Sequence, residues 1–162
     1  MDILKKYDFT LKLLLVLISI LQPFILISTQ GLLWSISSYW NTPLQPLFIL
    51  INAGTSYYFF NSEKWRLSGV LLLLLTAFSV ENYLMIHNIF AVGFFLSCIY
   101  PMVFIKRFRI LAFLYLMCIP LYPLLGMLFF EIYCVLIIGI YHLLTLIYQK
   151  RLENIRQKGL NI

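Results

Sequence analysis

Long apolar runs, separated by short polar segments, dominate the pattern along the chain. A helix needs about 20 apolar residues to cross the hydrocarbon of a bilayer. Two runs have roughly that length, and two more, Leu67–Ile105 and Ile110–Gln149, are each long enough for two helices. The runs are continuous rather than alternating, so helices are expected and strands are not. The predicted spans are about 9–28, 44–60, 67–83, 88–105, 107–122 and 127–149.

Composition supports a membrane protein. The 162 residues are 62% hydrophobic and only 11% charged, with a mean hydropathy of +0.94, whereas soluble domains carry about a quarter charged residues. We therefore expect an all-α, polytopic bundle of six transmembrane helices over residues 1–149. The first run is longer than the apolar region of a signal peptide and is interpreted as a retained helix. Residues 150–162 are expected to form a short basic cytoplasmic tail.

The positions of the basic residues predict the topology. They fall in the N-terminus, the second and fourth connections and the C-terminus, which share one side of a six-span chain. Basic connections stay in the cytoplasm, so both termini are expected there. The net charge of +6 is thus a topology signal and not evidence for nucleic-acid binding. The basic residues are Lys5, Lys6, Lys12, Lys64, Arg66, Lys106, Arg107, Arg109, Lys150, Arg151, Arg156 and Lys158.

Polar residues on the side without basic residues form the candidate site. Glu81 and Glu131 are the two acids expected there, and His87 shares that side across the turn from Glu81 to Asn88. Two carboxylates and an imidazole can bind a metal, perform acid–base chemistry or simply form a Glu–His pair, and all three alternatives stay open. No H-x-x-x-H or H-E-x-x-H metal spacing is present. We predict that His87 and Glu131 face a common cavity.

Other polar residues complete this picture. Asn82 and Asn88 are candidate ligand-binding residues beside the turn. Within the second span, Asn52 is expected to form an interhelical hydrogen bond, which is the common role of such residues.

The stretch from Ser35 to Phe104 resembles the six-span family of DRAM and FGF-receptor-activating (FRAG-type) proteins and their uncharacterised bacterial relatives. The resemblance extends over roughly Ile36–Gln149. Two family positions differ, because Phe90 stands where glycine is usual and Ile132 where tryptophan is frequent. The matching residues are Ser37, Ser38 and Tyr39 before the second span, His87, Ala91, Phe94 and Phe95 in the fourth, and Glu131 at the start of the sixth.

The resemblance implies a six-span fold and a role connected with lipids, because eukaryotic relatives act in GPI-anchor lipid remodelling and in lysosomal or autophagic regulation. The expected function is lipid handling or lipid modification at a polar outer-leaflet site, with His87 as base or ligand and Glu131 and Glu81 as its partners. The family resemblance also gives the expected lining of the site, which is Ser37, Ser38 and Tyr39. A non-catalytic interaction or regulatory protein is the alternative, and a small-solute transporter is the third. Membrane lipids and a membrane protein are the expected partners, and no cofactor is expected.

Overall fold

A computed structural model describes residues 2–104 and 108–159, including their side chains except those of residues 2–7, 121 and 157–159. All of its regular elements are helices, and these described residues contain no strand. The elements are α1 (Asp2–Gln30), the 3-10 helix η1 (Ile36–Asn41), α2 (Gln45–Phe60), the 3-10 helix η2 (Glu63–Trp65), α3 (Arg66–Ala77), α4 (Leu84–Phe104), α5 (Arg109–Leu116) and α6 (Cys118–Gly159).

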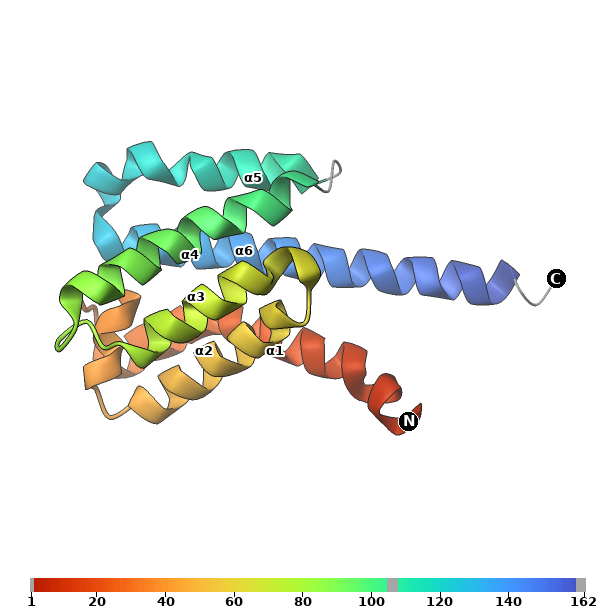
Figure 1. The fold of residues 1–162 in the computed structure, drawn as a ribbon, viewed down its shortest axis with the longest axis horizontal. Coiled ribbons are helices and arrows are strands. Elements are labelled where there is room, and N and C mark those ends of the chain that lie inside the picture. The colour runs from red at the N-terminus through yellow and green to blue at the C-terminus, as the bar shows by residue number, and fades with distance from the viewer. Residues whose placement is uncertain (1, 105–107, 160–162) are drawn as a thin grey trace.

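α6 consists of two segments that meet at Gly126. This glycine has φ +75° and ψ 170°, so the helix is interrupted there. Positive φ is accessible to glycine without the steric cost that a side chain brings. Residues 118–125 continue the course of α5, and the chain then turns back so that the rest of α6 runs the other way (Figure 1). The predicted boundary between the spans 107–122 and 127–149 therefore coincides with this break.

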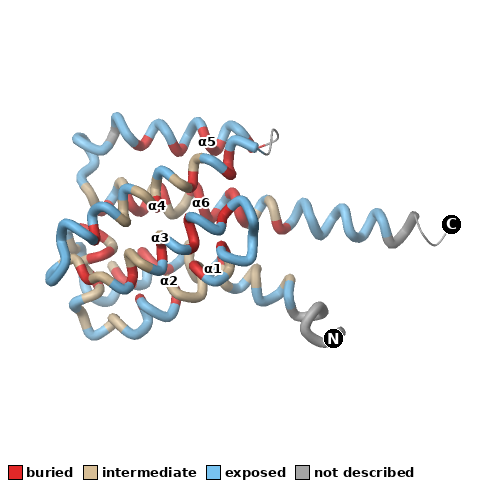
Figure 2. The backbone as a smooth tube through the Cα atoms, in the orientation of Figure 1, coloured by how far each residue is buried: buried red, intermediate tan, exposed pale blue. Residues whose placement is uncertain are grey.

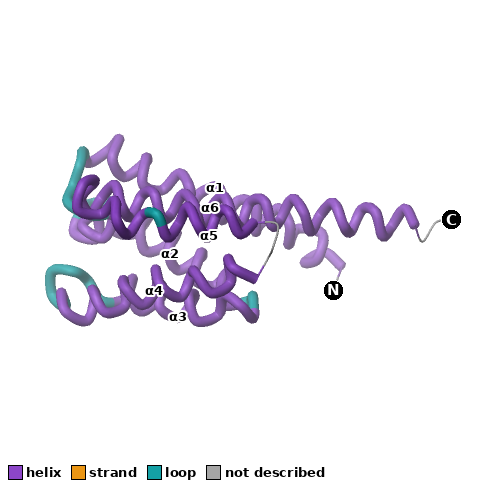
Figure 3. The backbone as a smooth tube through the Cα atoms, turned by 90° about the horizontal axis from the view of Figure 1, so that it is seen from above, coloured by secondary structure: helices purple, strands orange, loops and turns teal. Residues whose placement is uncertain are grey.

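The helices lie side by side with their axes roughly aligned, and α1 and α6 extend beyond the others (Figures 1 and 3). Both chain termini lie at the same end of this bundle, which we call the terminal end. η1 and the turn between α3 and α4 lie at the opposite end, which we call the η1 end. Consecutive helices pack together, and α6 also packs against α1.

Among the described residues, three helical stretches are long and apolar enough to cross a membrane: Asp8–Gln30, Leu84–Phe104 and Tyr122–Arg156. By length and composition, three helices rather than the predicted six qualify as membrane spans. α2 has 16 residues, α3 has 12 and α5 has 8. α3 ends at Ala77, six residues before the expected boundary, and α4 begins four residues early, at Leu84. The turn therefore lies at residues 78–83 rather than at 81–88.

Large apolar side chains cover the outside of the bundle. Leu50 is 71% exposed and Leu124 is 81% exposed, and exposed leucine, isoleucine, valine and phenylalanine side chains occur on every long helix. Figure 2 shows the same pattern, with buried positions turned inward and exposed positions outward. Such a surface suits hydrocarbon as its surroundings.

α2 and α3 make an especially close contact at Gly69. A Cβ atom at this position would lie 2.8 Å from the carbonyl oxygen of Ser56 and 2.9 Å from the amide nitrogen of Phe60. The Ser56 hydroxyl also donates a hydrogen bond to the Gly69 carbonyl at 2.5 Å. Small residues allow such approaches between helices in membranes, so Gly69 sets the distance between α2 and α3.

We predict that Gly69→Leu lowers the free energy of unfolding by about 1–3 kcal/mol, the usual effect of inserting a side chain into a close contact. Thermal unfolding in detergent, followed by circular dichroism, measures the effect. Gly93→Ala is the control, because its Cβ would meet nothing nearer than Leu71 at 3.5 Å. Equal melting temperatures for Gly69→Leu and the unmodified protein would contradict this role.

Candidate functional site

Glu131 binds the beginning of η1. It lies on α6, is 6% exposed, and its Oε2 accepts a hydrogen bond from the Ile36 amide at 2.5 Å. The first amides of a helix have no partner within the helix, and a carboxylate satisfies them through charge-assisted bonds. Glu131 therefore joins α6 to the connection between α1 and α2.

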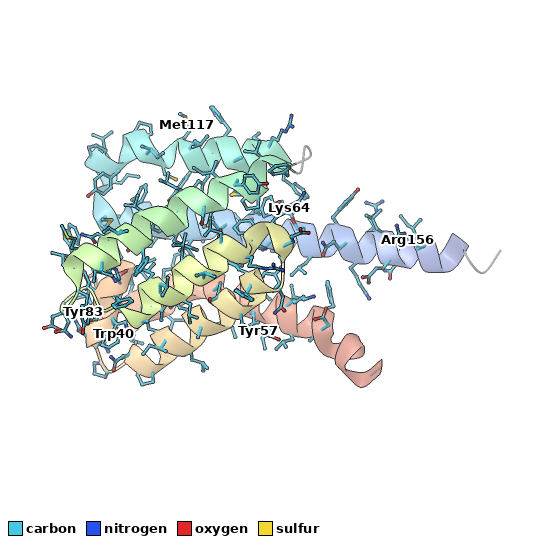
Figure 4. The ribbon with its side chains drawn as sticks, in the orientation of Figure 1. Trp40, Tyr57, Lys64, Tyr83, Met117 and Arg156 are labelled. Carbon is cyan, nitrogen blue, oxygen red and sulfur yellow. The ribbon has the colours of Figure 1, made fainter. Side chains whose placement is uncertain are left out.

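That connection, residues 31–44, folds as a cap over the η1 end. The fully buried Tyr39 hydroxyl donates to the Gly31 carbonyl at 2.6 Å and accepts from the Leu33 amide at 3.3 Å. Its ring belongs to a cluster with Leu26 and Leu128. Trp40 donates from Nε1 to the Thr76 carbonyl at 2.9 Å, which ties the cap to the end of α3. Figure 4 shows Trp40 at this end of the molecule.

His87 holds the turn between α3 and α4. It lies in the first turn of α4, is 4% exposed, and its Nδ1 is 2.7 Å from the Phe78 carbonyl oxygen. A carbonyl oxygen can only accept, so Nδ1 carries the proton in this bond. Glu81, Asn82 and Asn88, the other candidates near this turn, are exposed.

The structure brings together only some of the residues that the sequence grouped. Glu131 and Ser37 both line a cavity of about 50 Å³, which we call the η1 cavity. Its lining does not include His87, and Ser38 bonds to Ser35 at 2.9 Å instead. The ion pairs among the described side chains are Lys12–Asp8 and Lys150–Glu153, at 2.6 and 3.5 Å, so His87 is not paired with either candidate acid. The η1 cavity is lined by Ile36, Ser37, Phe48, Asn52, Leu72, Leu75, Thr76, Phe94, Phe95, Glu131 and Val135.

Metal binding was one chemical alternative for these acids and the histidine. Within residues 2–104 and 108–159, no three or more His, Cys, Asp and Glu side chains are grouped so that they could hold a metal ion. Cys98, Cys118 and Cys134 are free and buried.

A second cavity, of about 70 Å³, lies further along the interior, and we call it the central cavity. Two of its polar residues, Gln22 and His142, are 5% and 4% exposed. Their Nε2 atoms are the buried side-chain nitrogen or oxygen atoms without a hydrogen-bond partner in the described part of the chain. The cavity is lined by Leu15, Val16, Ser19, Gln22, Asn52, Thr55, Tyr58, Phe59, Leu72, Phe94, Val135, Ile138, Gly139 and His142.

Sequence reasoning missed this cavity and misjudged Asn52. The Asn52 side chain donates to the Phe48 carbonyl of its own helix at 3.0 Å, and it lines both cavities. The polar contact between α1 and α2 is made instead by Ser19 and Thr55, whose hydroxyl oxygens are 2.6 Å apart. Gln22 was the sequence feature that could have indicated the central cavity, because it is a polar residue inside an otherwise apolar run.

A third pocket, of about 410 Å³, lies at the terminal end, and we call it the basic pocket. Two lysines line it, while no Asp or Glu does. Lys12 is paired with Asp8, and the Lys64 Nζ lies 4.8 Å from the centre of the Phe104 ring. The basic pocket is lined by Lys12, Tyr58, Asn61, Ser62, Lys64, Trp65, Tyr141, His142, Thr145, Leu146 and Gln149.

Comparison of the chain with protein-family models, with curated proteins and with solved structures gives no match.

We predict that Glu131→Ala loosens the cap, because the Ile36 amide then loses its charged partner in a buried position. Leaving such a buried donor unsatisfied costs about 1–3 kcal/mol. Hydrogen–deuterium exchange followed by mass spectrometry should show faster exchange in peptides from residues 31–44.

Glu81→Ala is the matched control, because Glu81 is exposed on the turn at residues 78–83. It should leave exchange in residues 31–44 unchanged. Identical exchange in the Glu131 variant and the unmodified protein would show that this hydrogen bond does not hold the cap.

Proposed function

We propose that this chain is an integral membrane protein of six spans with both termini in the cytoplasm, and that it binds the headgroup of an anionic phospholipid in the basic pocket. The single observation that carries the lipid proposal is this pocket, a polar recess lined by two lysines at one end of an otherwise apolar surface.

The arrangement of the helices supports six spans. The three shorter elements lie alongside the longer ones (Figure 3). α2 is about 24 Å long at 1.5 Å per residue, and α5 is extended by residues 118–125. A bilayer adapts to short helices by thinning locally, at a modest cost. α3, with 12 residues, is the shortest of the six proposed spans, and η2 lies directly before it.

The basic side chains support the orientation. Lys64 lies at the terminal end, and Arg156 lies on the part of α6 that extends beyond the bundle (Figure 4). The Lys150 Nζ lies 5.6 Å from the centre of the Phe9 ring, so this basic residue of α6 lies beside α1. Basic segments remain on the cytoplasmic side. Five basic side chains that contributed to the topology prediction lie outside the described part of the structure: those of Lys5, Lys6, Lys106, Arg107 and Lys158.

The chemistry of the basic pocket suits a phosphate-bearing headgroup. Ammonium groups bind phosphate as point charges, and Lys64 forms no ion pair with the described acids. Asn61, Ser62 and Gln149 add neutral hydrogen-bonding groups for a glycerol or other polar headgroup. The volume of about 410 Å³ falls in the range of ligand pockets, roughly 300–1,000 Å³.

This proposal keeps the lipid handling expected from the sequence and moves its site to the opposite end of the bundle. Glu131 and His87 are already bonded to backbone groups of the protein, and Tyr39 is fully buried. These bonds give the three residues structural roles, and lipid binding in the basic pocket involves none of them. Kinship with the DRAM and FRAG-type family, which also handles lipids, remains a proposal that rests on the short sequence motifs.

We predict that single cysteines at Asn41 and Asn82 react with a membrane-impermeant maleimide added outside intact cells. A cysteine at Ser62 should react only after the membrane is opened, because it lies close to Lys64 of η2 and Arg66 of α3. Asn41, Asn82 and Ser62 are all exposed, and the three native cysteines can be removed first. Outside labelling at Ser62, or its absence at Asn82, would refute the proposed topology.

We predict that the purified protein binds phosphatidylglycerol more tightly than phosphatidylcholine, and that Lys64→Gln removes this preference. Loss of one charge-assisted contact should weaken phosphatidylglycerol binding about tenfold. Native mass spectrometry in detergent, with each lipid titrated separately, measures the occupancy.

Lys150→Gln is the control for a general loss of positive charge. Lys150 is exposed, bonds to Glu153 and does not line the basic pocket, so its removal should leave the preference intact. Equal binding of the two lipids by the unmodified protein, or equal losses in both variants, would leave the non-catalytic interaction protein as the better interpretation.

A further inference from the structure

The three cavities follow one another through the interior of the bundle. The η1 cavity and the central cavity share Asn52, Leu72, Phe94 and Val135 in their linings. The central cavity and the basic pocket share Tyr58 and His142. Neighbouring cavities therefore share walls along the bundle, from Glu131 near the η1 end to the lysines at the terminal end.

The central cavity has the properties of a hydrated one. Gln22 and His142 each bring a buried nitrogen without a protein partner, and Ser19, Thr55 and Asn52 add oxygen atoms. Purely apolar cavities stay dry, whereas polar cavities of sufficient volume hold water that bonds to such groups. About 70 Å³ is room for a few water molecules and well below the size of ordinary ligand pockets.

Two titratable groups stand at the two boundaries of this hydrated space. Glu131 lines the η1 cavity, and His142 lies where the central cavity meets the basic pocket. Ionisable residues inside a membrane bundle are rare and commonly serve proton relays or ion pathways. His142 bonds to no described carboxylate, and its ring is packed in an aromatic cage, with the Phe59 ring centre at 4.7 Å and the Trp65 ring centre at 4.2 Å.

We propose that the protein conducts protons across the membrane through water in these cavities, with His142 and Glu131 as the relay groups. His142 takes a proton on one ring nitrogen and releases another from the second nitrogen. Waters beside Gln22 and Asn52 carry it to the Glu131 carboxylate, which binds a proton and later releases it. One proton enters at one end for each proton that leaves at the other, and no electron is transferred.

Hydroxyl groups continue this route toward the η1 end. Ser37 lines the cavity beside Glu131, and the Ser35 and Ser38 hydroxyl oxygens are 2.9 Å apart in the same cap. A hydroxyl can donate one proton while it accepts another. Ser38 is half-buried and Asn41 is exposed, so the cap leads from the η1 cavity to the surface.

The linings favour protons over larger ions. Leucine, valine and phenylalanine form much of the walls, and such side chains cannot replace the hydration shell of Na⁺ or K⁺ as carbonyl oxygens do in a selectivity filter. Neither the central cavity nor the η1 cavity is lined by Lys or Arg, the fixed cations that oppose proton passage. Of these three cavities, the basic pocket is the one that lysines line, and there the Asp8 carboxylate balances the charge of Lys12.

The test is proton flux into liposomes that contain the purified protein and the trapped pH dye pyranine. A potassium gradient with valinomycin sets the membrane potential that drives the protons. We expect flux several-fold above that of protein-free liposomes. Gln22→Leu and Glu131→Gln should each bring it close to the protein-free value. His142→Phe should do the same while it keeps the stacking on Phe59.

Glu81→Gln is the matched control, because it neutralises a carboxylate that is exposed and lines none of the three cavities. It should conduct like the unmodified protein. Circular dichroism and recovery in the liposomes identify any variant that fails to fold. Flux of the unmodified protein no greater than that of protein-free liposomes would overturn the proposal whatever the variants do. Full flux in folded Gln22→Leu and His142→Phe would overturn the assigned route. Lipid binding by the basic pocket is measured in a separate experiment, so its outcome does not depend on the proton flux.

Discussion

A backbone group without a hydrogen-bond partner costs several kcal/mol in hydrocarbon, and this constraint accounts for the polar residues that hold the bundle together. The last carbonyls of a helix have no donor within it. Here side chains from elsewhere in the chain supply those donors. Trp40 bonds to the Thr76 carbonyl near the end of α3, and Tyr141 bonds to the Pro101 carbonyl near the end of α4. His87 serves the Phe78 carbonyl in the same way.

At the N-terminus of a helix the amides lack acceptors, and Glu131 supplies an acceptor at the start of η1. Because its partner is the Ile36 amide, a residue 95 positions away in the chain fixes the start of η1. The cap at the η1 end, the contact between α6 and that cap, and the η1 cavity all depend on this bond. The carboxylate that the sequence marks as a candidate reactive group thus also holds the backbone of the cap.

Hydropathy and charge were sufficient to predict the helical class, the break near Gly126 and the gathering of basic residues at one end. They could not predict that α3 stops at Ala77, because Phe78 and Val80 continue the apolar pattern beyond the last helical residue. His87 and Glu131 both bond to segments at the η1 end, yet lying at one end does not specify a contact between them. Hydrogen bonds such as Glu131 to Ile36 depend on the packing of distant segments, which local patterns do not encode. Gln22 was visible in its apolar run, but only the fold shows that it faces a cavity.

The pairing of the first helix with the last has a consequence for biosynthesis. α1 packs on α6, and the closeness of Ile20 to Gly139 leaves no space for a side chain there. A ribosome completes α1 long before it reaches Gly139, so α1 leaves the ribosome while this partner does not yet exist. Until then Ser19 can bond to Thr55 of α2, whereas the α6 side of the cavity beside Gln22 is missing. Closure of the bundle is therefore a late event in the synthesis of the chain, because it needs both α1 and the last helix.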